Sequence, residues 1–201
     1  MSLLAFVLPV LAYLMGSVST AVLVSRALGL PDPRATGSRN PGATNVLRIG
    51  GKKAAIITLL GDVLKGVLPV VLARGLGAGP VVIAIVAVCA FAGHLFPVFF
   101  GFRGGKGVAT ALGVLLGISP VGGLALLGVW LFVAIVFRYS SLSALTAAIA
   151  APFLVVLAVP ASRVPYGLAT LVMSALLLWR HRSNIRNLLN GTETKIGAKA
   201  D

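Results

Sequence analysis

Acidic residues and cysteine are scarce in this chain. Its 201 residues include only 4 Asp and Glu and one cysteine, against 17 Lys and Arg. Cys89 stands alone in an apolar run, which excludes an internal disulfide, and we expect it to be a small buried hydrophobe. No acidic residues have the spacing of metal ligands, so the sequence predicts no metal site.

The chain also lacks polar stretches long enough for a soluble domain. It is 58% hydrophobic and 10% charged, and its mean hydropathy of +1.04 excludes an ordinary soluble protein. A net charge of +13 is compatible with nucleic-acid binding. We exclude that function because the basic residues lie between apolar runs and no zinc, RRM or helix-turn-helix pattern occurs. Cytoplasmic loops of membrane proteins are routinely basic, which explains the sign of the charge.

Apolar runs dominate what is present, and several reach the ~20 residues that a helix needs to cross a bilayer. The sequence therefore predicts an all-α, polytopic membrane protein with a single domain over residues 1–201 and seven transmembrane helices, the fourth and seventh of them short. The predicted segments are Leu3–Val24, Ala54–Leu72, Val81–Phe100, Val108–Ile118, Val121–Phe137, Leu142–Val159 and Tyr166–Trp179.

The distribution of Lys and Arg predicts the orientation. No basic residue precedes the first apolar segment and Arg26 follows it, so we interpret that segment as a retained span with its N-terminus outside. Seven crossings then place the C-terminus and nearly all positive charges in the cytoplasm, with Arg74 and Arg163 outside and Lys65 within a span. The alternative fuses residues 108–137 into one helix, and this six-crossing arrangement nearly abolishes the charge asymmetry.

Most positive charges lie in three polar stretches, which we name the first (Gly37–Lys53), second (Gly101–Gly107) and third (Arg180–Lys195) basic segments. In the first segment, Pro and Gly favour a fixed, irregular backbone, and many side chains suit phosphate oxygens. Its candidate site residues are Ser38, Asn40, Gly42, Thr44, Asn45 and Arg48.

The second basic segment contains the run Gly104-Gly105-Lys106-Gly107 and precedes a short apolar helix. Glycines let backbone N–H groups approach an anion, and the following helix directs its positive end at the loop. The run is not a Walker A loop, because Phe100 stands where glycine is needed and Gly107 stands where Ser or Thr binds magnesium. A plain tight turn remains the alternative to an anion site.

The third basic segment is expected to extend the last helix beyond the membrane. His181, Asn184 and Leu188 would share one helix face, and Gly191 is expected to stop the helix. The alternative for the arginines at 180, 182 and 186 is anchoring to lipid head groups.

Charged residues also occur inside the apolar segments. Asp62 and Lys65 are three residues apart, and either a structural ion pair or a substrate contact explains them. His94 ends the third apolar segment as either a structural histidine or an acid, base or donor for the site.

Together the three basic segments resemble the bacterial acyl-phosphate:glycerol-3-phosphate acyltransferase family. The matching runs are Gly37–Arg48, Gly93–Thr110 and His181–Glu193, with further similarity at Gly16-Ser17 and Asp62–Gly66. The resemblance implies a multi-pass enzyme of the bacterial cytoplasmic (inner) membrane that acts on its cytoplasmic face. It would move a fatty acyl group from acyl phosphate to the first hydroxyl of glycerol 3-phosphate, giving lysophosphatidic acid and phosphate in the first step of phospholipid synthesis.

The resemblance also implies which residues line the site. Ser38, Arg48, His94, Lys106 and Asn184 would be catalytic. The substrate-binding residues would be Asn40, Gly42, Thr44, Asn45, Gly104, Gly105, Gly107, Thr110, His181 and Glu193. No cofactor and no obligatory protein partner are implied, and membrane lipid surrounds the chain.

Two positions depart from the family pattern. Arg39 stands where glycine is frequent, so we assign it no chemistry, and Asn187 stands where arginine is common. The proton acceptor stays open between His94, His181 and the substrate's own phosphate. An alternative function is a membrane transporter of a phosphate-bearing anion, although no internal repeat is evident.

Overall fold

The long apolar runs form helices, because a backbone in hydrocarbon must satisfy its own N–H and C=O groups. The computed structural model describes residues 3–197, and over these residues the chain forms nine α-helices, two short 3₁₀ helices and no β-strand. The expected all-helical class is confirmed. The α-helices are α1 Leu4–Gly16, α2 Thr20–Ala27, α3 Ala43–Gly75, α4 Pro80–Leu95, α5 Val108–Ile118, α6 Pro120–Phe137, α7 Ser140–Ala158, α8 Arg163–Arg180 and α9 Arg182–Leu189.

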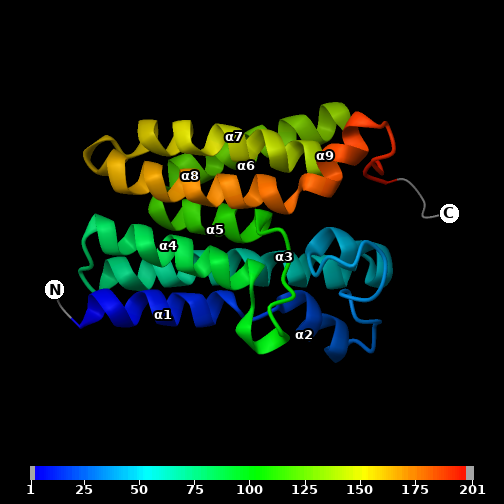
Figure 1. The fold of residues 1–201 in the computed structure, drawn as a ribbon, viewed down its shortest axis with the longest axis horizontal. Coiled ribbons are helices and arrows are strands. Elements are labelled where there is room, and N and C mark those ends of the chain that lie inside the picture. Colours follow the sequence, from blue (N-terminus) through cyan, green and yellow to red (C-terminus); the bar gives the residue numbers. More distant parts are fainter. Residues whose placement is uncertain (1–2, 198–201) are drawn as a thin grey trace.

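Six helical segments of the described chain are long and apolar enough to cross a membrane. They are α1 with α2, then α3, α4 with its following 3₁₀ turn Val98–Phe100, α6, α7, and α8 with its preceding 3₁₀ turn Pro160–Ser162. Helix α5 has the bounds that its sequence predicts, but its 11 residues span only about 16 Å. In Figure 1 it lies in the middle of the bundle, where it packs against α3, α4, α6 and α8.

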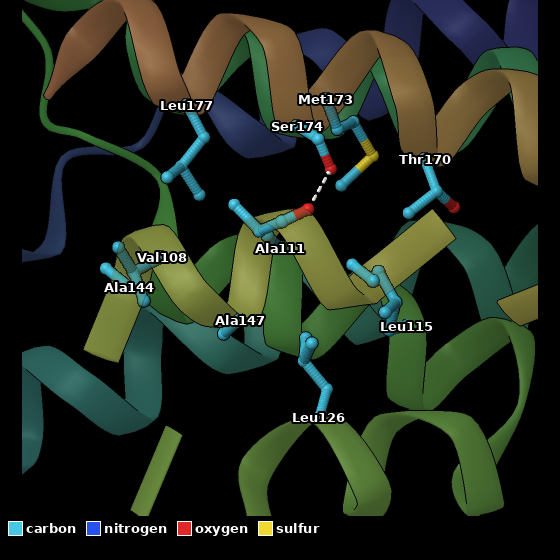
Figure 2. A pocket seen from close by; sticks show the side chains of 12 residues that line it. Val108, Ala111, Leu115, Leu126, Ala144, Ala147, Thr170, Met173, Ser174 and Leu177 are labelled. Atoms are coloured by element: carbon cyan, nitrogen blue, oxygen red, sulfur yellow. Dashed lines mark hydrogen bonds between the residues drawn. The ribbon is translucent and has the colours of Figure 1, made fainter. Parts of the chain in front are cut away.

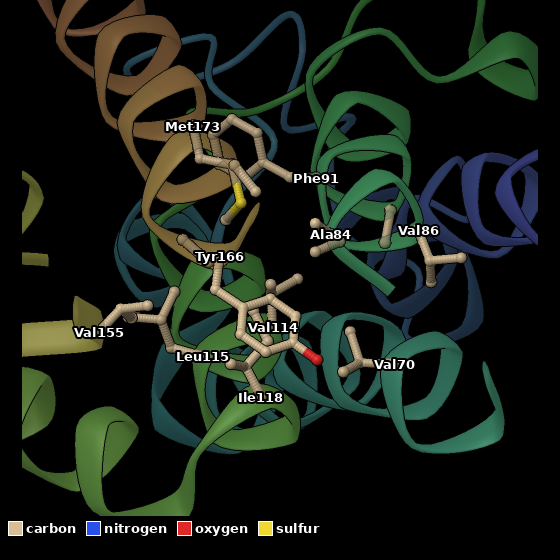
Figure 3. Packing of buried hydrophobic residues seen from close by; sticks show 14 of the residues in the cluster. Val70, Ala84, Val86, Phe91, Val114, Leu115, Ile118, Val155, Tyr166 and Met173 are labelled. Carbon is tan, nitrogen blue, oxygen red and sulfur yellow. The ribbon is translucent and has the colours of Figure 1, made fainter. Parts of the chain in front are cut away.

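The helices bury their smaller residues and expose large apolar ones, which is typical of surfaces that face lipid. Ile135 and Leu157 are 76% and 78% exposed on α6 and α7. Figure 3 shows the opposite side of the pattern, a core in which Phe91 of α4 and Val114 of α5 lie among residues of α3 and α8.

The backbones of α3 and α5 approach closely where small residues meet. A Cβ atom added at Gly66 would lie 2.3 Å from the Thr110 carbonyl oxygen, and one at Gly113 would lie 2.1 Å from the Val63 carbonyl oxygen. Small residues at such crossings permit tight helix packing in lipid. This packing holds α5 in place although it is short.

The predicted single span Leu3–Val24 is wrong in one respect, because the helix breaks at Ser17–Ser19, between α1 and α2. The Lys65 ammonium group donates a hydrogen bond to the Val18 carbonyl oxygen at 2.8 Å. A side chain of α3 thus satisfies a carbonyl group that the break removes from the helical ladder. Hydropathy detects the length of the apolar run but not this tertiary contact.

Two other helix boundaries differ from prediction. Helix α3 starts at Ala43, inside the first basic segment, and kinks at Gly51, whose φ is +75°. The last transmembrane helix does not continue through the third basic segment. It ends at Arg180, the chain turns at His181, and the separate helix α9 follows. Gly191, with φ +69°, lies just after α9, which confirms the predicted stop.

The ends of the helices sort into two groups (Figure 1). The described N-terminal end and the connections α3–α4, α5–α6 and α7–α8 lie at one end of the long axis. The loop before α3, the α6–α7 turn and α9 lie toward the other end. The second basic segment belongs to the α4–α5 connection, which lies nearer the middle of the long axis (Figure 1). The placing of all three basic segments on one side of the membrane stays a prediction.

Candidate active site

The second basic segment is held against the end of α4 by its own backbone. The Gly105 N–H group donates a hydrogen bond to the His94 carbonyl oxygen at 3.2 Å. A Cβ atom at Gly104 would lie 2.1 Å from that same oxygen, and one at Gly105 would lie 2.3 Å from His94 Nε2. Close packing alone therefore requires glycine at both positions, and a plain tight turn would explain the two glycines equally well. The argument for an anion site depends on the groups around them.

Arg180 of α8 fixes the other side of this loop. Its Nε donates to the Gly105 carbonyl oxygen at 3.1 Å, and its Nη2 donates to the Gly104 carbonyl oxygen at 2.6 Å. The sequence offers lipid anchoring as the alternative for Arg180 and does not predict these two hydrogen bonds. The only available signal was its position immediately before His181 in the third basic segment.

The start of α5 leaves donors free next to this loop. Gly107 is the N-cap residue, with φ +87°, and no side chain caps the helix. The first N–H groups of an α-helix have no partner within the helix, and they favour an anion at that end. The Thr110 hydroxyl, also predicted to line the site, is buried there and has no hydrogen-bond partner among residues 3–197.

Lys106 joins the second basic segment to the third. Its Nζ donates to Asn184 Oδ1, and Asn184 Nδ2 donates to Glu193 Oε1 at 2.7 Å. The same carboxylate oxygen accepts a hydrogen bond from Ser141 Oγ at 2.6 Å. Four side chains from separate parts of the chain thus form one network, and Ser141 is a member that no sequence motif indicated.

Burial lowers the pKa of Lys106, and the carboxylate of Glu193 opposes that effect. The positive charges of Arg180 and Arg48 lower the pKa further. The ammonium group is therefore partly buried, with two positive neighbours and one carboxylate near it. Such an excess of positive charge favours the binding of a further anion.

The two histidines occupy different environments. His181 is 3% exposed, and its Nδ1 lies 2.9 Å from the Leu177 carbonyl oxygen. Burial lowers the pKa of His181 to about 4, so the ring is neutral at physiological pH, with Nδ1 donating and Nε2 left as an acceptor. His94 is also buried, and its Nδ1 lies 3.6 Å from Asp62 Oδ1, beyond hydrogen-bond distance.

Asp62 and Lys65 form a buried ion pair with 2.8 Å between Nζ and Oδ1. Of the two explanations that the sequence left open, the structure shows the structural pair. Their contacts run to His94 and to the break between α1 and α2 rather than to the Lys106 network.

The first basic segment is organised by Asn45. Its Nδ2 donates to the carbonyl oxygens of Pro33 and Thr36 at 2.9 and 3.0 Å, and its Oδ1 accepts from the Ser38 N–H group at 2.9 Å. Asn45 is 1% exposed, so the structure shows it supporting the loop from within. Its contact with substrate stays a prediction.

The remaining residues of this segment surround the start of α3. Gly42 is the N-cap residue and no side chain caps the helix. Ser38, Thr44 and Arg48 are exposed and Asn40 is half-buried.

One contact joins the first basic segment to the second, and another joins residues that lie just before each of them. A Cβ atom at Gly105 would lie 3.0 Å from the Pro41 carbonyl oxygen, and Arg34, just before the segment, donates to the Phe100 carbonyl oxygen at 3.4 Å. All three segments therefore converge, although they are far apart in the sequence.

An apolar pocket begins beside this convergence. It is lined by Val108, which is two residues beyond Lys106, and by residues of α5, α6, α7 and α8 that include Ala111, Ala144 and Leu177 (Figure 2). Its lining is almost entirely apolar, and it lies next to the charged groups around Lys106. Among residues 3–197, no three His, Cys, Asp or Glu side chains gather where they could hold a metal, and metal independence stays a prediction.

The fold and the site define a multi-pass membrane protein with a cationic, phosphate-compatible site at one end of its helix bundle. Comparison with known proteins identifies its family. The family model for glycerol-3-phosphate acyltransferase matches residues 6–191, so the chain belongs to that family.

Similar proteins cover nearly the whole chain. The glycerol-3-phosphate acyltransferase of Thioalkalivibrio sulfidiphilus is 62% identical over 98% of this chain and 96% of its own length. That of Methylococcus capsulatus is 59% identical over 94% of both chains. Crystal structures of PlsY (YgiH), an integral membrane glycerol 3-phosphate acyltransferase, are also similar. The glycerol 3-phosphate form has a TM-score of 0.89 and 41% identity over 96% of each chain. The lysophosphatidic acid form has a TM-score of 0.87 and 39% identity over 96% of this chain and 95% of that one.

Proposed function

We propose that this protein transfers a fatty acyl group from acyl phosphate to the first hydroxyl of glycerol 3-phosphate. The products are lysophosphatidic acid and inorganic phosphate. The observation that carries the proposal is the network of Lys106, Asn184 and Glu193, which joins distant basic segments beside uncapped helix starts.

The reaction needs an electrophile, a nucleophile and a place for one proton. The hydroxyl oxygen attacks the carbonyl carbon of acyl phosphate, and the bond from that carbon to the phosphate oxygen then breaks. Lys106 and Arg48 stabilise the negative charge on the carbonyl oxygen and on the departing phosphate, together with backbone N–H groups. These N–H groups belong to Gly104, Lys106, Gly107 and the α5 N-terminus, because that of Gly105 is bonded to His94. Ser38 and Asn184 position the substrates, while Asn40, Thr44 and the start of α3 bind the second phosphate.

Of the three proton acceptors that the sequence left open, the two histidines are poorly suited to take the hydroxyl proton. The pKa of about 4 makes His181 a weak base at neutral pH. His94 Nε2 is turned toward Gly105 in a buried position. We therefore assign the proton to a substrate phosphate, and we give His181 Nε2 the role of accepting a hydrogen bond from substrate.

We further propose the arrangement in the membrane. Seven crossings, with α5 as a short one, place the N-terminus outside and the C-terminus in the cytoplasm of the bacterial inner membrane. The alternating helix directions and the convergence of the basic segments support this orientation (Figure 1). The active site then opens on the cytoplasmic face, where water-soluble glycerol 3-phosphate is available.

The test uses purified protein in detergent micelles. With acyl phosphate and glycerol 3-phosphate, we expect lysophosphatidic acid and phosphate to appear in equal amounts. A transporter of a phosphate-bearing anion requires a sealed vesicle, whereas this reaction does not. If micelles yield no product while vesicles accumulate phosphate, the transporter function replaces this proposal.

A further inference from the structure

The residues after α9 form a strap across the α6–α7 turn. We define the C-terminal strap as residues 192–197, drawn in red at the end of the described chain in Figure 1. The Thr192 N–H group starts it with a hydrogen bond to the Asn187 carbonyl oxygen at 2.9 Å. Further along, the Lys195 ammonium group lies 5.7 Å from the centre of the Tyr139 ring.

Arg138 fastens the far end of the strap with a reciprocal pair of hydrogen bonds. The Ile196 N–H group donates to the Arg138 carbonyl oxygen at 2.6 Å, and Arg138 Nη2 donates to the Ile196 carbonyl oxygen at 3.2 Å. Glu193 lies between these two fastened ends of the strap. Its carboxylate is thereby held where Ser141 and Asn184 donate to it.

The backbone at Arg138 adds an independent argument. Arg138 ends α6 in the left-handed region, with φ +62°. Glycine is the residue that this position favours, because a Cβ atom is strained in the left-handed region. The chain has an arginine in this unfavourable conformation, and the side chain of that arginine reaches the strap.

We propose that Arg138 is a positioning residue for the acyl transfer, acting through the C-terminal strap. By fixing Ile196 it holds Glu193 against Asn184, and Asn184 in turn fixes the Lys106 ammonium group. The inference rests on the proposed function for its kinetic consequences, but the clamp itself can be tested without any turnover.

The kinetic test compares Arg138→Gly with wild type and with Arg138→Lys. Glycine suits the backbone, so the Arg138→Gly protein should melt at the wild-type temperature or above. We expect its kcat to fall on the order of tenfold, within the loss that a small misplacement of a catalytic group produces. KM for glycerol 3-phosphate should change less than about twofold, because the lost effect is on the transition state. Arg138→Lys retains a donor for Ile196 and should recover most of the activity.

A double-mutant cycle identifies the route of the effect. In a Glu193→Ala background the strap has no carboxylate to position, so Arg138→Gly should lower kcat less than about twofold further. Equal losses in both backgrounds would show that Arg138 does not act through Glu193. An unchanged kcat in the single variant would equally overturn the proposal.

Trypsin cleavage after Lys195 tests the clamp independently of activity. Arg138→Gly keeps the backbone hydrogen bond from the Ile196 N–H group and loses only the side-chain bond to the Ile196 carbonyl oxygen. The strap should then open more often, so Arg138→Gly in micelles should be cut after Lys195 several times faster than wild type, as followed by mass spectrometry. An unchanged cleavage rate would show that Arg138 does not hold the strap, even if the enzyme were active. Inactive wild-type protein would contradict the proposed function, and the cleavage result would still decide about the clamp.

Discussion

At the residue scale, the proposed acyl transfer depends most on Lys106. Its ammonium group is partly buried and bonded to Asn184, next to free N–H groups at the start of α5. We expect Lys106→Ala to lose at least about 10²-fold in kcat, the scale of losing one group that stabilises developing charge. The measurement is lysophosphatidic acid formation in micelles.

The matched control for this variant is Lys53→Ala, an exposed lysine on α3 that has no part in the site. Both variants should elute as folded protein in detergent. If Lys106→Ala turns over at the wild-type rate, Lys106 has no place in the mechanism.

The lowered pKa of His181 predicts how the free energy of unfolding depends on pH. Its pKa falls from 6.5 to about 4 in the folded protein, first because it is buried. The unfolded chain therefore binds more protons between these values, so stability is greatest above pH 6.5 and decreases as the pH falls toward 4. The shift corresponds to about 3 kcal/mol. Melting temperatures should fall over that window in wild type and fall less in His181→Asn, whose amide can still donate to Leu177. Parallel curves would assign the loss to other groups.

At Arg39, a departure from the family pattern has an energetic consequence. Glycine is frequent at this position in the family that the sequence resembles, and the structure gives Arg39 a φ of +55°. Replacing it with glycine should stabilise the protein by about 1 kcal/mol, because the left-handed region penalises a Cβ atom. Activity should remain at the wild-type level. A lower melting temperature, or a loss of turnover, would mean that the Arg39 side chain has a function that its exposure conceals.

At the element scale, the ion pair of α3 connects three helices. Lys65 bonds both Asp62 and the carbonyl of Val18 at the α1–α2 break, and Asp62 faces His94 of α4. Lys65→Met leaves a buried carboxylate without a partner, which costs about 3–5 kcal/mol. Adding Asp62→Asn removes that charge, so the double variant should melt above the single one. Additive destabilisation in detergent would contradict a coupled pair.

Sequence patterns predicted the elements better than their interruptions. Helix α5 has its predicted bounds because Gly107 precedes it and Ser119-Pro120 follows it, and these are local signals. The breaks at Ser17–Ser19 and His181 were not predicted. The first depends on a tertiary contact, because the Lys65 ammonium group binds the Val18 carbonyl oxygen that the break leaves without a helical partner.

In the candidate site, too, local motifs could be predicted and tertiary contacts could not. The basic segments and most candidate residues were visible as local motifs. Their convergence was predicted from the resemblance and from charge counting, whereas the particular contacts depend on the packing of separate helices. Arg180 and Ser141 illustrate this, because each bonds a residue far away in the sequence. The part that Asn45 plays inside its own loop likewise follows from hydrogen bonds that no spacing rule predicts.

At the scale of the whole molecule, the proposal depends on which side of the membrane the converged segments face. The chain offers a clean test because Cys89 is its only cysteine. In a Cys89→Ser background, one cysteine can be placed at Ala161, exposed between α7 and α8, or at Ser183, exposed on α9. These positions lie at the two ends of α8, so they must label from opposite sides.

Seven crossings with the N-terminus outside predict which position labels from outside. An impermeant maleimide added to intact spheroplasts should react with Ala161→Cys, whereas Ser183→Cys should react only after the membrane is permeabilised. The six-crossing alternative predicts the reverse, because fusing α5 to α6 inverts every later helix. That outcome would place Lys106 and Asn184 on opposite sides of the membrane, although they are bonded in the fold. Labelling of Ser183→Cys from outside would therefore overturn the topology and the cytoplasmic site together.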